Sequence, residues 1–332
     1  MKKKIIFTCG DINGICPEII IRSLQFLKSN SSSCYTVICP PAVFENAVKK
    51  LKARIKFKFT DNPDNRESGI TVYPLEEKRQ QTGGATKSSG ETAYEAIKLA
   101  VEFAKNRQAD AIVTAPISKT ALNMAGINFP GHTEMIAEWT NSKHFVMTFL
   151  SKRMKASLVT IHKPLKKVSV LITEKNLHST FSVVINSLRY DLNIDKPKIA
   201  VLGLNPHAGE NGIIGSEDQE IIGPSLNSYP ERSFLSGPFS PDAFFANRLY
   251  KNFDMVIGMY HDQVLIPFKL LNFGGGVNYT AGLPIVRTSP DHGVAYDIAG
   301  KNLADPSSFI EAVKYAEKIS NSRKRNEKKK SF

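Results

Sequence analysis

The sequence predicts an α/β fold with a largely parallel or mixed sheet, because short β-branched runs alternate along it with longer amphipathic segments. The chain has 332 residues, 42% hydrophobic and 23% charged, which is an ordinary globular composition. A chain of this length typically forms about two domains. Predicted strands cover residues 5–9, 35–39, 111–114, 198–202 and 255–259, and predicted helices cover 42–51, 91–106 and 119–124.

Residues 10–18, which follow the first predicted strand, read Gly-Asp-Ile-Asn-Gly-Ile-Cys-Pro-Glu. The glycines permit a tight turn, and Pro17 suits the first position of a helix that continues through Leu27. Exposed amides at the start of such a helix can bind an anion. An ordinary turn between a strand and a helix explains the same pattern, so both interpretations stay open.

A second polar segment begins where the strand at 111–114 ends. The next helix is predicted to open at residues 131–134, Gly-His-Thr-Glu. His132 and Thr133 at a helix N-terminus can hold a phosphate through the amides, the hydroxyl and the imidazole. The alternative is that Thr133 only caps the helix.

Three histidines follow apolar runs and begin polar turns: His162, His207 and His261. Three neutral imidazoles with an open fourth position form a catalytic site for a divalent metal. A single histidine at a strand end is more often simply hydrogen-bonded, and only the shared context favours a metal. We expect His144 and His178 to be surface residues.

The segment 260–300 has the highest density of chemically useful side chains. It contains Tyr-His-Asp-Gln at 260–263, then Lys269, Asn278 and Arg287, and a loop at 291–300 bounded by glycine. These polar groups alternate with apolar runs at 264–266 and 283–286, so we expect them where buried strands end. The sequence therefore predicts an active site here.

The formal charge of +13 does not by itself indicate nucleic-acid binding. The basic tail at 323–330 contributes +5 of it, and other lysines are scattered without an aromatic platform. The four cysteines, Cys9, Cys16, Cys34 and Cys39, form no C-x-x-C pair, so we expect inert, buried thiols. Because no apolar run reaches the length of a signal-peptide core or a membrane span, we expect a cytoplasmic protein without membrane partners.

Taken together, these segments resemble the 4-hydroxythreonine-4-phosphate dehydrogenase family of vitamin B6 biosynthesis, from residue 10 to about residue 312. The matching pieces are 10–18, 114–119, 131–134, His162 with 164–165, 204–210 with Gly215, 237–238 with Asp242 and Phe245, 260–263 and 282–300. The first and last pieces also resemble the wider isocitrate and isopropylmalate dehydrogenase superfamily.

The resemblance implies a two-domain fold of the isocitrate/isopropylmalate dehydrogenase type, with the active site in the interdomain cleft at a homodimer interface. We place the first domain at 1–125 and 272–322, the second at 126–271, and a basic tail at 323–332. The resemblance further implies that the loop at 291–300 binds the adenosine of NAD or NADP. The residues of this loop that it assigns to the cofactor are Asp291, His292, Gly293, Ala295, Asp297 and Gly300.

The resemblance also assigns the remaining site residues. It implies that His162, His207 and His261 bind a divalent zinc, magnesium or cobalt ion. The substrate-binding residues that it implies are His132, Thr133, Lys269, Asn278 and Arg287, of which Lys269, together with His261, is catalytic. The implied reaction is oxidation of 4-phosphooxy-L-threonine to 2-amino-3-oxo-4-phosphooxybutanoate, which decarboxylates to 3-amino-2-oxopropyl phosphate.

The chain departs from the family pattern at four positions. Ile12, Asn13 and Cys16 stand where the family usually has Pro, Ala and Gly, and Val294 replaces a usual Thr. We expect these changes to affect cofactor affinity and loop geometry. Three alternatives stay open: a paralogue that oxidises D-threonate or D-erythronate 4-phosphate, a metal-dependent phosphohydrolase, and a non-catalytic basic binding protein.

Overall fold

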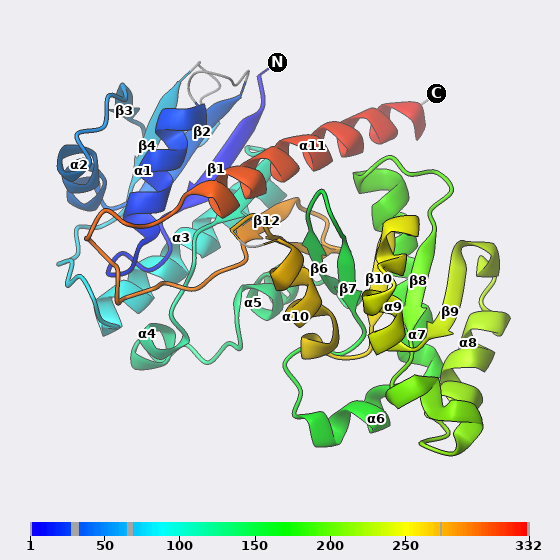
Figure 1. Ribbon diagram of the computed structural model, residues 1–332. Helices are drawn as coiled ribbons and strands as arrows, with labels where there is room; N and C mark the ends of the chain where they lie inside the picture. The colour runs from blue at the N-terminus through cyan, green and yellow to red at the C-terminus, as the bar shows by residue number, and fades with distance from the viewer. Residues whose placement is uncertain (1, 28–32, 65–68, 273, 331–332) are drawn as a thin grey trace. The chain divides into compact units, whose positions relative to one another are not determined.

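The computed structural model describes residues 2–27, 33–64, 69–272 and 274–330 (Figure 1). The chain divides into two compact units, Met1–Ser142 with Leu283–Asn321, and Lys143–Gly282 with Ser322–Phe332. These boundaries lie later in the chain than residues 125 and 271. One reason is that Trp139 packs edge-on against Tyr94 of the first unit, with ring centroids 5.3 Å apart.

Unit 1 is built on a parallel sheet with the strand order β3-β4-β2-β1-β5-β12. Its strands are β1 (Lys4–Thr8), β2 (Cys34–Cys39), β3 (Phe57–Phe59), β4 (Ile70–Pro74), β5 (Ala111–Thr114) and β12 (Arg287–Pro290). The central strands are buried from end to end, as their β-branched sequences predict.

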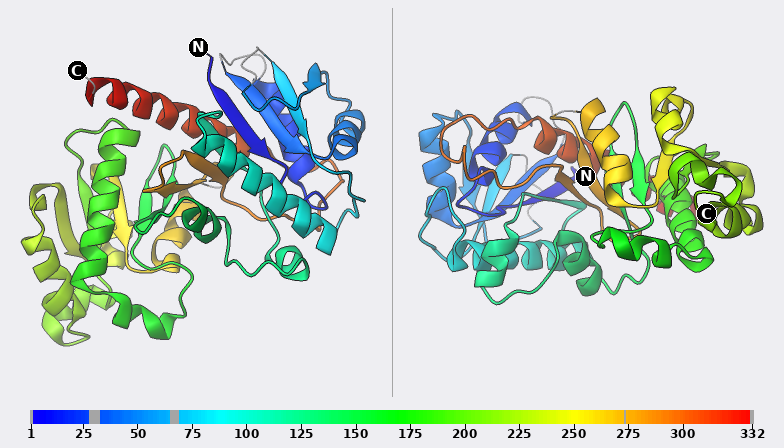
Figure 2. Two further views of the ribbon diagram at one scale, coloured as in Figure 1. Left: turned by 180° about the vertical axis from the view of Figure 1, so that it is seen from behind. Right: turned by 60° about the horizontal axis from the view of Figure 1, so that its bottom comes forward.

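Helices cover both faces of this sheet, with α1 (Cys16–Leu27) on one face and α3 (Lys87–Lys105) on the other (Figures 1 and 2). Helix α3 begins within the segment 80–90, because Thr86 and Ser89 form a capping box. The other helices of unit 1 are α2 (Pro41–Lys50), α4 (Lys119–Met124) and α5 (His132–Trp139).

Unit 2 contains a mixed sheet with the order β11-β6-β7-β10-β8-β9. Its strands are β6 (Val146–Leu150), β7 (Ala156–Leu158), β8 (Ile199–Leu202), β9 (Leu235–Phe239), β10 (Met255–Gly258) and β11 (Val277–Ala281). Its helices are α6 (Val168–Leu171), α7 (Glu174–Asn186), α8 (Gly223–Ser228), α9 (Pro241–Ala246) and α10 (His261–Leu271). Helix α10 closes the core by packing Phe268 against Phe149 of β6.

Helix α10 corrects one expectation from the sequence. The apolar run at 264–266 belongs to this helix and not to a strand, so Lys269 lies in the last helical turn. A short apolar run does not distinguish a buried strand from a buried helix. Val264 and Leu265 face the core while Ile266 is exposed, which is the pattern of an amphipathic helix.

The basic tail is also more ordered than its composition indicates. Helix α11 (Ser307–Lys330) runs through 323–330, and residues 331–332 lie outside the described part of the chain. Arg323 donates to the buried Asp191 from Nε at 2.7 Å and to the Tyr279 hydroxyl from Nη2 at 3.0 Å. The tail therefore begins with an ion pair that anchors the helix in unit 2.

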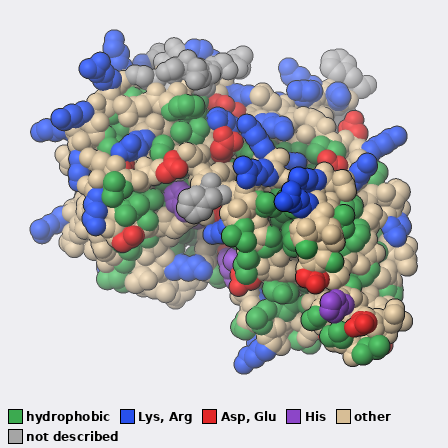
Figure 3. All heavy atoms as spheres, viewed as in Figure 1, with side chains coloured by type: hydrophobic (Ala, Val, Ile, Leu, Met, Phe, Trp, Pro, Cys, Tyr) green, Lys and Arg blue, Asp and Glu red, His purple; other side chains and the backbone are tan. Residues whose placement is uncertain are grey.

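The charged surface is mixed in sign over the face shown in Figure 3, where Lys and Arg side chains occupy many separate places with Asp and Glu among them. Among the described residues, no helix is long and apolar enough to cross a membrane. All four cysteines are buried thiols, as expected. Burial raises the pKa of the Cys16 and Cys39 thiols well above the usual value, which keeps them protonated.

Candidate active site

Unit 1 brings Arg287, His132 and Thr133 into one neighbourhood. Arg287 begins β12 and is 1% exposed, and its guanidinium donates to Thr114 Oγ1 from Nε at 3.0 Å and from Nη2 at 2.8 Å. Thr114 is the last residue of the adjacent strand β5. The buried guanidinium of Arg287, at the start of β12, therefore reaches the end of the neighbouring parallel strand β5.

Helix α5 begins at the same place with His132, directly after the N-cap residue Gly131. The N-cap is therefore not Thr133, which is 2% exposed in the first turn. In the described part of the chain, His132 Nε2 is buried and has no hydrogen-bond partner. A buried imidazole nitrogen in this state can accept or donate a hydrogen bond to a ligand.

The electrostatics of this cluster favour an anion. Burial lowers the pKa of Arg287 to about 9, and the negative charge of Glu134 opposes that shift. Burial, followed by the charge of Arg287, lowers the pKa of His132 well below its usual value. A neutral imidazole thus accompanies a desolvated guanidinium, and a phosphate would compensate the buried positive charge.

The loop at 291–300 also lies in unit 1. It contacts residues 10–15, the turn between β1 and α1, which we call the first turn. Ile15 N donates to Val294 O at 2.9 Å, and a Cβ added to Gly14 would lie 2.5 Å from that oxygen. Only glycine permits this close approach. The turn that carries two of the departures from the family pattern is therefore in direct contact with the loop that the resemblance assigns to the cofactor.

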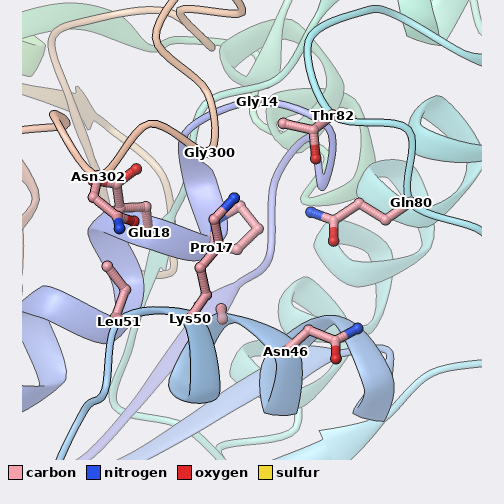
Figure 4. Close-up of a pocket in the computed structure, with 11 residues that line it drawn as sticks. Gly14, Pro17, Glu18, Asn46, Lys50, Leu51, Gln80, Thr82, Gly300 and Asn302 are labelled. Carbon is pink, nitrogen blue, oxygen red and sulfur yellow. The ribbon is translucent and has the colours of Figure 1, made fainter.

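A pocket of about 440 Å³ opens beside this loop (Figure 4). Its walls come from the first turn, the end of α2, the segment before α3 and the end of the 291–300 loop. Its polar lining residues include Lys50, Gln80, Thr82 and Asn302.

Unit 2 places His162 and His261 side by side, with ring centroids 6.2 Å apart. His261 is the first residue of α10, and His162 follows β7 with a positive φ of 50°. They line an open hollow of about 590 Å³ together with Thr160, Lys163, Leu165, Tyr260 and Asp262. Asp262 Oδ1 is 2.7 Å from His261 Nδ1, an arrangement that fixes the ring and leaves Nε2 for another partner.

His207 lies elsewhere in unit 2, on an exposed turn between Pro206 and Gly212. Five successive residues of this turn, 207–211, have left-handed backbone angles, and four of them are not glycine. Such conformations cost about 1–3 kcal/mol per residue and persist only where surrounding contacts impose them.

The buried carboxylate of Asp218 supplies those contacts. It accepts hydrogen bonds from Leu204 N at 2.7 Å, and from Asn205 N and Nδ2 at 3.0 Å each. A Cβ added to Gly203 would lie 2.6 Å from Asp218 Oδ1, so the chain passes directly over the carboxylate. Asp218 thereby fixes the start of the turn that carries His207.

Gln263 connects this turn with the histidine at the start of α10. Its side chain accepts a hydrogen bond from Met259 N at 2.7 Å and donates one to Gly203 O at 2.6 Å. Met259 directly precedes the Tyr260-His261 pair, and Gly203 lies four residues before His207. The side-chain amide of Gln263 therefore links the segment that carries His261 to the segment that carries His207.

The remaining predicted substrate residues lie in unit 2. Lys269 is exposed on α10, and Asn278 is half-buried on β11. Within the described residues, Asn278 Oδ1 is buried and lacks a hydrogen-bond partner, as His132 Nε2 does in unit 1. Each unit therefore contains one predicted substrate residue with an unused buried polar atom.

No group of three His, Cys, Asp or Glu side chains in the described ranges is arranged to hold a metal ion. His162 and His261 are neighbours, and His207 does not complete a triad with them. The chemistry of the pair still fits a divalent ion, because Asp262 orients one imidazole and both rings border the same hollow.

Residues 31–316 match the family described as pyridoxal phosphate biosynthetic protein PdxA. This chain belongs to that family. It is 41% identical over 315 residues to the 4-hydroxythreonine-4-phosphate dehydrogenase of Sulfurihydrogenibium sp. (strain YO3AOP1), with 94% of this chain and 97% of that protein covered. The crystal structure of the 4-hydroxythreonine-4-phosphate dehydrogenase from Klebsiella pneumoniae has a TM-score of 0.85 at 34% identity, covering 96% of this chain and 100% of that one.

Other relatives of this PdxA family member have a different name. The D-threonate 4-phosphate dehydrogenase of Pectobacterium atrosepticum is 36% identical, with 95% of this chain and 99% of that protein covered. The family resemblance and the α/β fold predicted from the sequence are confirmed. Dehydrogenase activity is the function that this membership supports.

Sequence reasoning missed several residues that shape the site. Asp218 and Thr114 had no predicted role, and Asn13 was noted only as a departure from the family pattern. Asp218 acts on residues 13 and 14 positions away, and Thr114 contacts a residue 173 positions away. No local periodicity signals such contacts, although the position of Thr114 at a strand end was a usable hint.

Proposed function

We propose that this protein oxidises the secondary hydroxyl of 4-phosphooxy-L-threonine with NAD in the presence of a divalent metal. The observation that carries the proposal is the cluster of Arg287, His132 and Thr133, a buried cation at a helix start in a chain whose relatives are named for phosphorylated substrates. The product is a 3-keto acid that loses carbon dioxide to give 3-amino-2-oxopropyl phosphate.

The substrate phosphate is assigned to the unit 1 cluster. Arg287 supplies a desolvated positive charge, His132 Nε2 supplies a hydrogen bond, and Thr133 lies in the first turn of α5, where backbone amides face an anion. Lys269 and Asn278 are assigned to the remaining polar groups of the substrate. Lys269 would place a positive charge near the oxygen that becomes the carbonyl, which also favours decarboxylation.

The metal is assigned to His162 and His261, which border one hollow, and to His207 as the third ligand that the family resemblance implies, with zinc, magnesium and cobalt as candidates. A bound divalent ion would polarise the substrate hydroxyl oxygen, and a bound nicotinamide would accept the hydride. The role of this chain is to hold the imidazoles in a fixed orientation. Asp262 does so for His261, and the turn held by Asp218 does so for His207.

The cofactor is assigned to Asp291, His292, Gly293, Ala295, Asp297 and Gly300. Support comes from the contact between this loop and the first turn, and from the pocket that Gly300 and Asn302 border. NAD is preferred over NADP on the family resemblance, and parallel titrations with the two cofactors decide between them.

A homodimer is the proposed assembly, because several large apolar side chains of unit 2 are exposed. Ile213 is 83% exposed and Leu270 is 80% exposed, and other members of this set are Leu165, Val170 and Ile266. A contiguous exposed apolar patch marks an association surface, and Ile266 and Leu270 lie one helical turn apart on α10. Sedimentation velocity on the wild type and on Leu270→Glu tests this proposal, and monomeric wild-type protein contradicts it.

The competing substrate is D-threonate 4-phosphate, which names a relative at 36% identity. The two substrates differ in an amino or a hydroxyl group, and both present the phosphate that Arg287 would bind. The test is NADH formation with each substrate in parallel at equal concentrations. A higher kcat/KM for 4-phosphooxy-L-threonine supports the proposal, and turnover of D-threonate 4-phosphate alone reassigns the protein.

A further inference from the structure

The side chain of Asn13 is hydrogen-bonded to several residues of the segment that leads into helix α3. It is fully buried, and its Nδ2 donates to Gly84 O and Thr86 Oγ1 at 3.0 Å each. Its Oδ1 accepts a hydrogen bond from Gln81 N at 2.7 Å. The Asn13 side chain therefore forms three hydrogen bonds with a segment that lies some seventy positions later in the sequence.

The backbone around Asn13 adds two further bonds to the same stretch. Gly83 N donates to Asn13 O at 2.9 Å, and Gln80 Nε2 donates to Ile12 O at 2.6 Å. Residues 80–86 are consequently bound to the first turn along their whole length. The segment would otherwise be a glycine-containing connection with few constraints of its own.

The bound segment forms one wall of the 440 Å³ pocket. Gln80 and Thr82 line this pocket, on either side of the Gln81 amide that Asn13 holds (Figure 4). Gly14, the neighbour of Asn13, lines it too, and so does Gly300, where an added Cβ would lie 3.1 Å from Thr82 Cγ2. Loss of the Asn13 side chain would release this wall without removing any lining residue.

A second group of hydrogen bonds joins the 291–300 loop to the same turn. Tyr296 of the 291–300 loop donates to Asp11 Oδ2 at 2.6 Å, and Ser89 Oγ donates to the same oxygen at 3.2 Å. Asp11 Oδ1 in turn accepts a hydrogen bond from Asn13 N at 2.9 Å. Asp11 and Asn13 thus join three segments, the first turn, residues 80–89 and the 291–300 loop.

We propose that Asn13 is a positioning residue that pre-forms the wall at residues 80–86 for the dinucleotide. This inference rests on the proposed function, since it takes the pocket beside Gly300 as part of the NAD site. Asn13 acts on affinity through loop order and does not touch the reacting atoms. A pocket that is already ordered binds more tightly, because less conformational entropy is lost on binding.

The test is Asn13→Ala, which introduces the residue that the family pattern usually has here and so preserves the fold. Calorimetric titration with NAD should show a Kd about tenfold higher than that of the wild type, which corresponds to about 1.4 kcal/mol. The KM for NAD should rise in parallel, with kcat and the KM for the phosphorylated substrate within twofold. Hydrogen exchange should accelerate at 80–86.

Asn176→Ala is the matched control, because Asn176 also donates a side-chain hydrogen bond to a backbone carbonyl, but in unit 2. It should leave the Kd for NAD and exchange at 80–86 unchanged. Unchanged NAD affinity in Asn13→Ala, with wild-type protein that does bind NAD, overturns this inference alone. A wild-type protein that does not bind NAD overturns the proposed function and the cofactor role of Asn13 with it.

Discussion

The candidate phosphate cluster of unit 1 and the histidines of unit 2 are built in opposite ways. Arg287 and Thr133 are buried at a strand end and a helix start, where regular structure fixes them. His162 and His207 are exposed on turns with left-handed backbone angles. Regular elements therefore hold the groups assigned to the phosphate, whereas two of the three histidines assigned to the metal lie on turns, and Asp218 holds the turn that carries His207. The third histidine, His261, begins helix α10.

The largest expected effect is that of His261→Ala on turnover. Removing an imidazole from a three-histidine site should abolish both stoichiometric metal binding and NADH formation. Metal content by plasma mass spectrometry and initial rates are the measurements. Phosphate binding by unit 1 should persist, and His178→Ala is the control, since His178 lies on α7 with Ser225 O as its partner. Full metal content with a normal rate in His261→Ala would refute the assignment.

Arg287→Met comes next and probes the other region. Loss of a buried charge partner for a phosphate costs about 2–5 kcal/mol, which corresponds to a fall in kcat/KM of roughly 1.5 to 4 orders of magnitude. Metal content should stay at the wild-type level. Arg189→Met, which removes a guanidinium paired with Glu231 in unit 2, serves as the control. A kcat/KM within threefold of the wild type would exclude Arg287 from phosphate binding.

Asp218→Asn should have an intermediate effect, because it disturbs a proposed ligand only through its turn. The amide cannot accept all three N–H hydrogen bonds that the carboxylate accepts. Metal affinity should fall about ten- to a hundredfold, the usual cost of losing a group that orients a ligand. Competition with a chromophoric chelator measures it, and Asp195→Asn, a substitution in a different segment, is the control. Wild-type affinity would mean that the turn does not depend on Asp218.

The smallest effect is a pH dependence of stability in unit 1. The pKa of His132 is lower in the folded protein than its unfolded value of about 6.5. The unfolded state thus binds more protons below pH 6.5, and the free energy of unfolding falls as the pH drops through that value. Urea denaturation at pH 7.5 and 5.5 should show this fall reduced in His132→Gln. An equal fall in His132→Gln and in His144→Gln, an exposed control, would contradict this cause.

The sequence predicted strand β5 and helix α4 at their observed bounds, because the residues that flank each of these short segments mark both of its ends clearly. It misassigned the run at 264–266, where Pro267 and a three-residue apolar stretch conceal the helical period. It located Arg287 and His132 as candidates, yet could not predict the partner Thr114. Contacts of that kind depend on which strands become neighbours, and strand order has no local signature.

Sequence also could not reveal what holds the histidines. The left-handed turn at 207–211 and its anchor Asp218 arise from packing around a buried carboxylate. Likewise, the departure Asn13 is explained only by its bonds to residues 81–86. The buried side-chain amide of Asn13 forms hydrogen bonds with polar groups of this segment, which an alanine at that position would leave to water. This role can be recognised only in the folded structure, where the two segments are neighbours.

The most direct test of the account is NADH formation from 4-phosphooxy-L-threonine by chelator-treated protein, measured before and after a divalent metal is restored. We predict no turnover without the metal, full recovery with it, and substrate binding by calorimetry that persists in the metal-free protein. Turnover at the full rate in metal-free protein would contradict the division of work between the histidines of unit 2 and the phosphate cluster of unit 1.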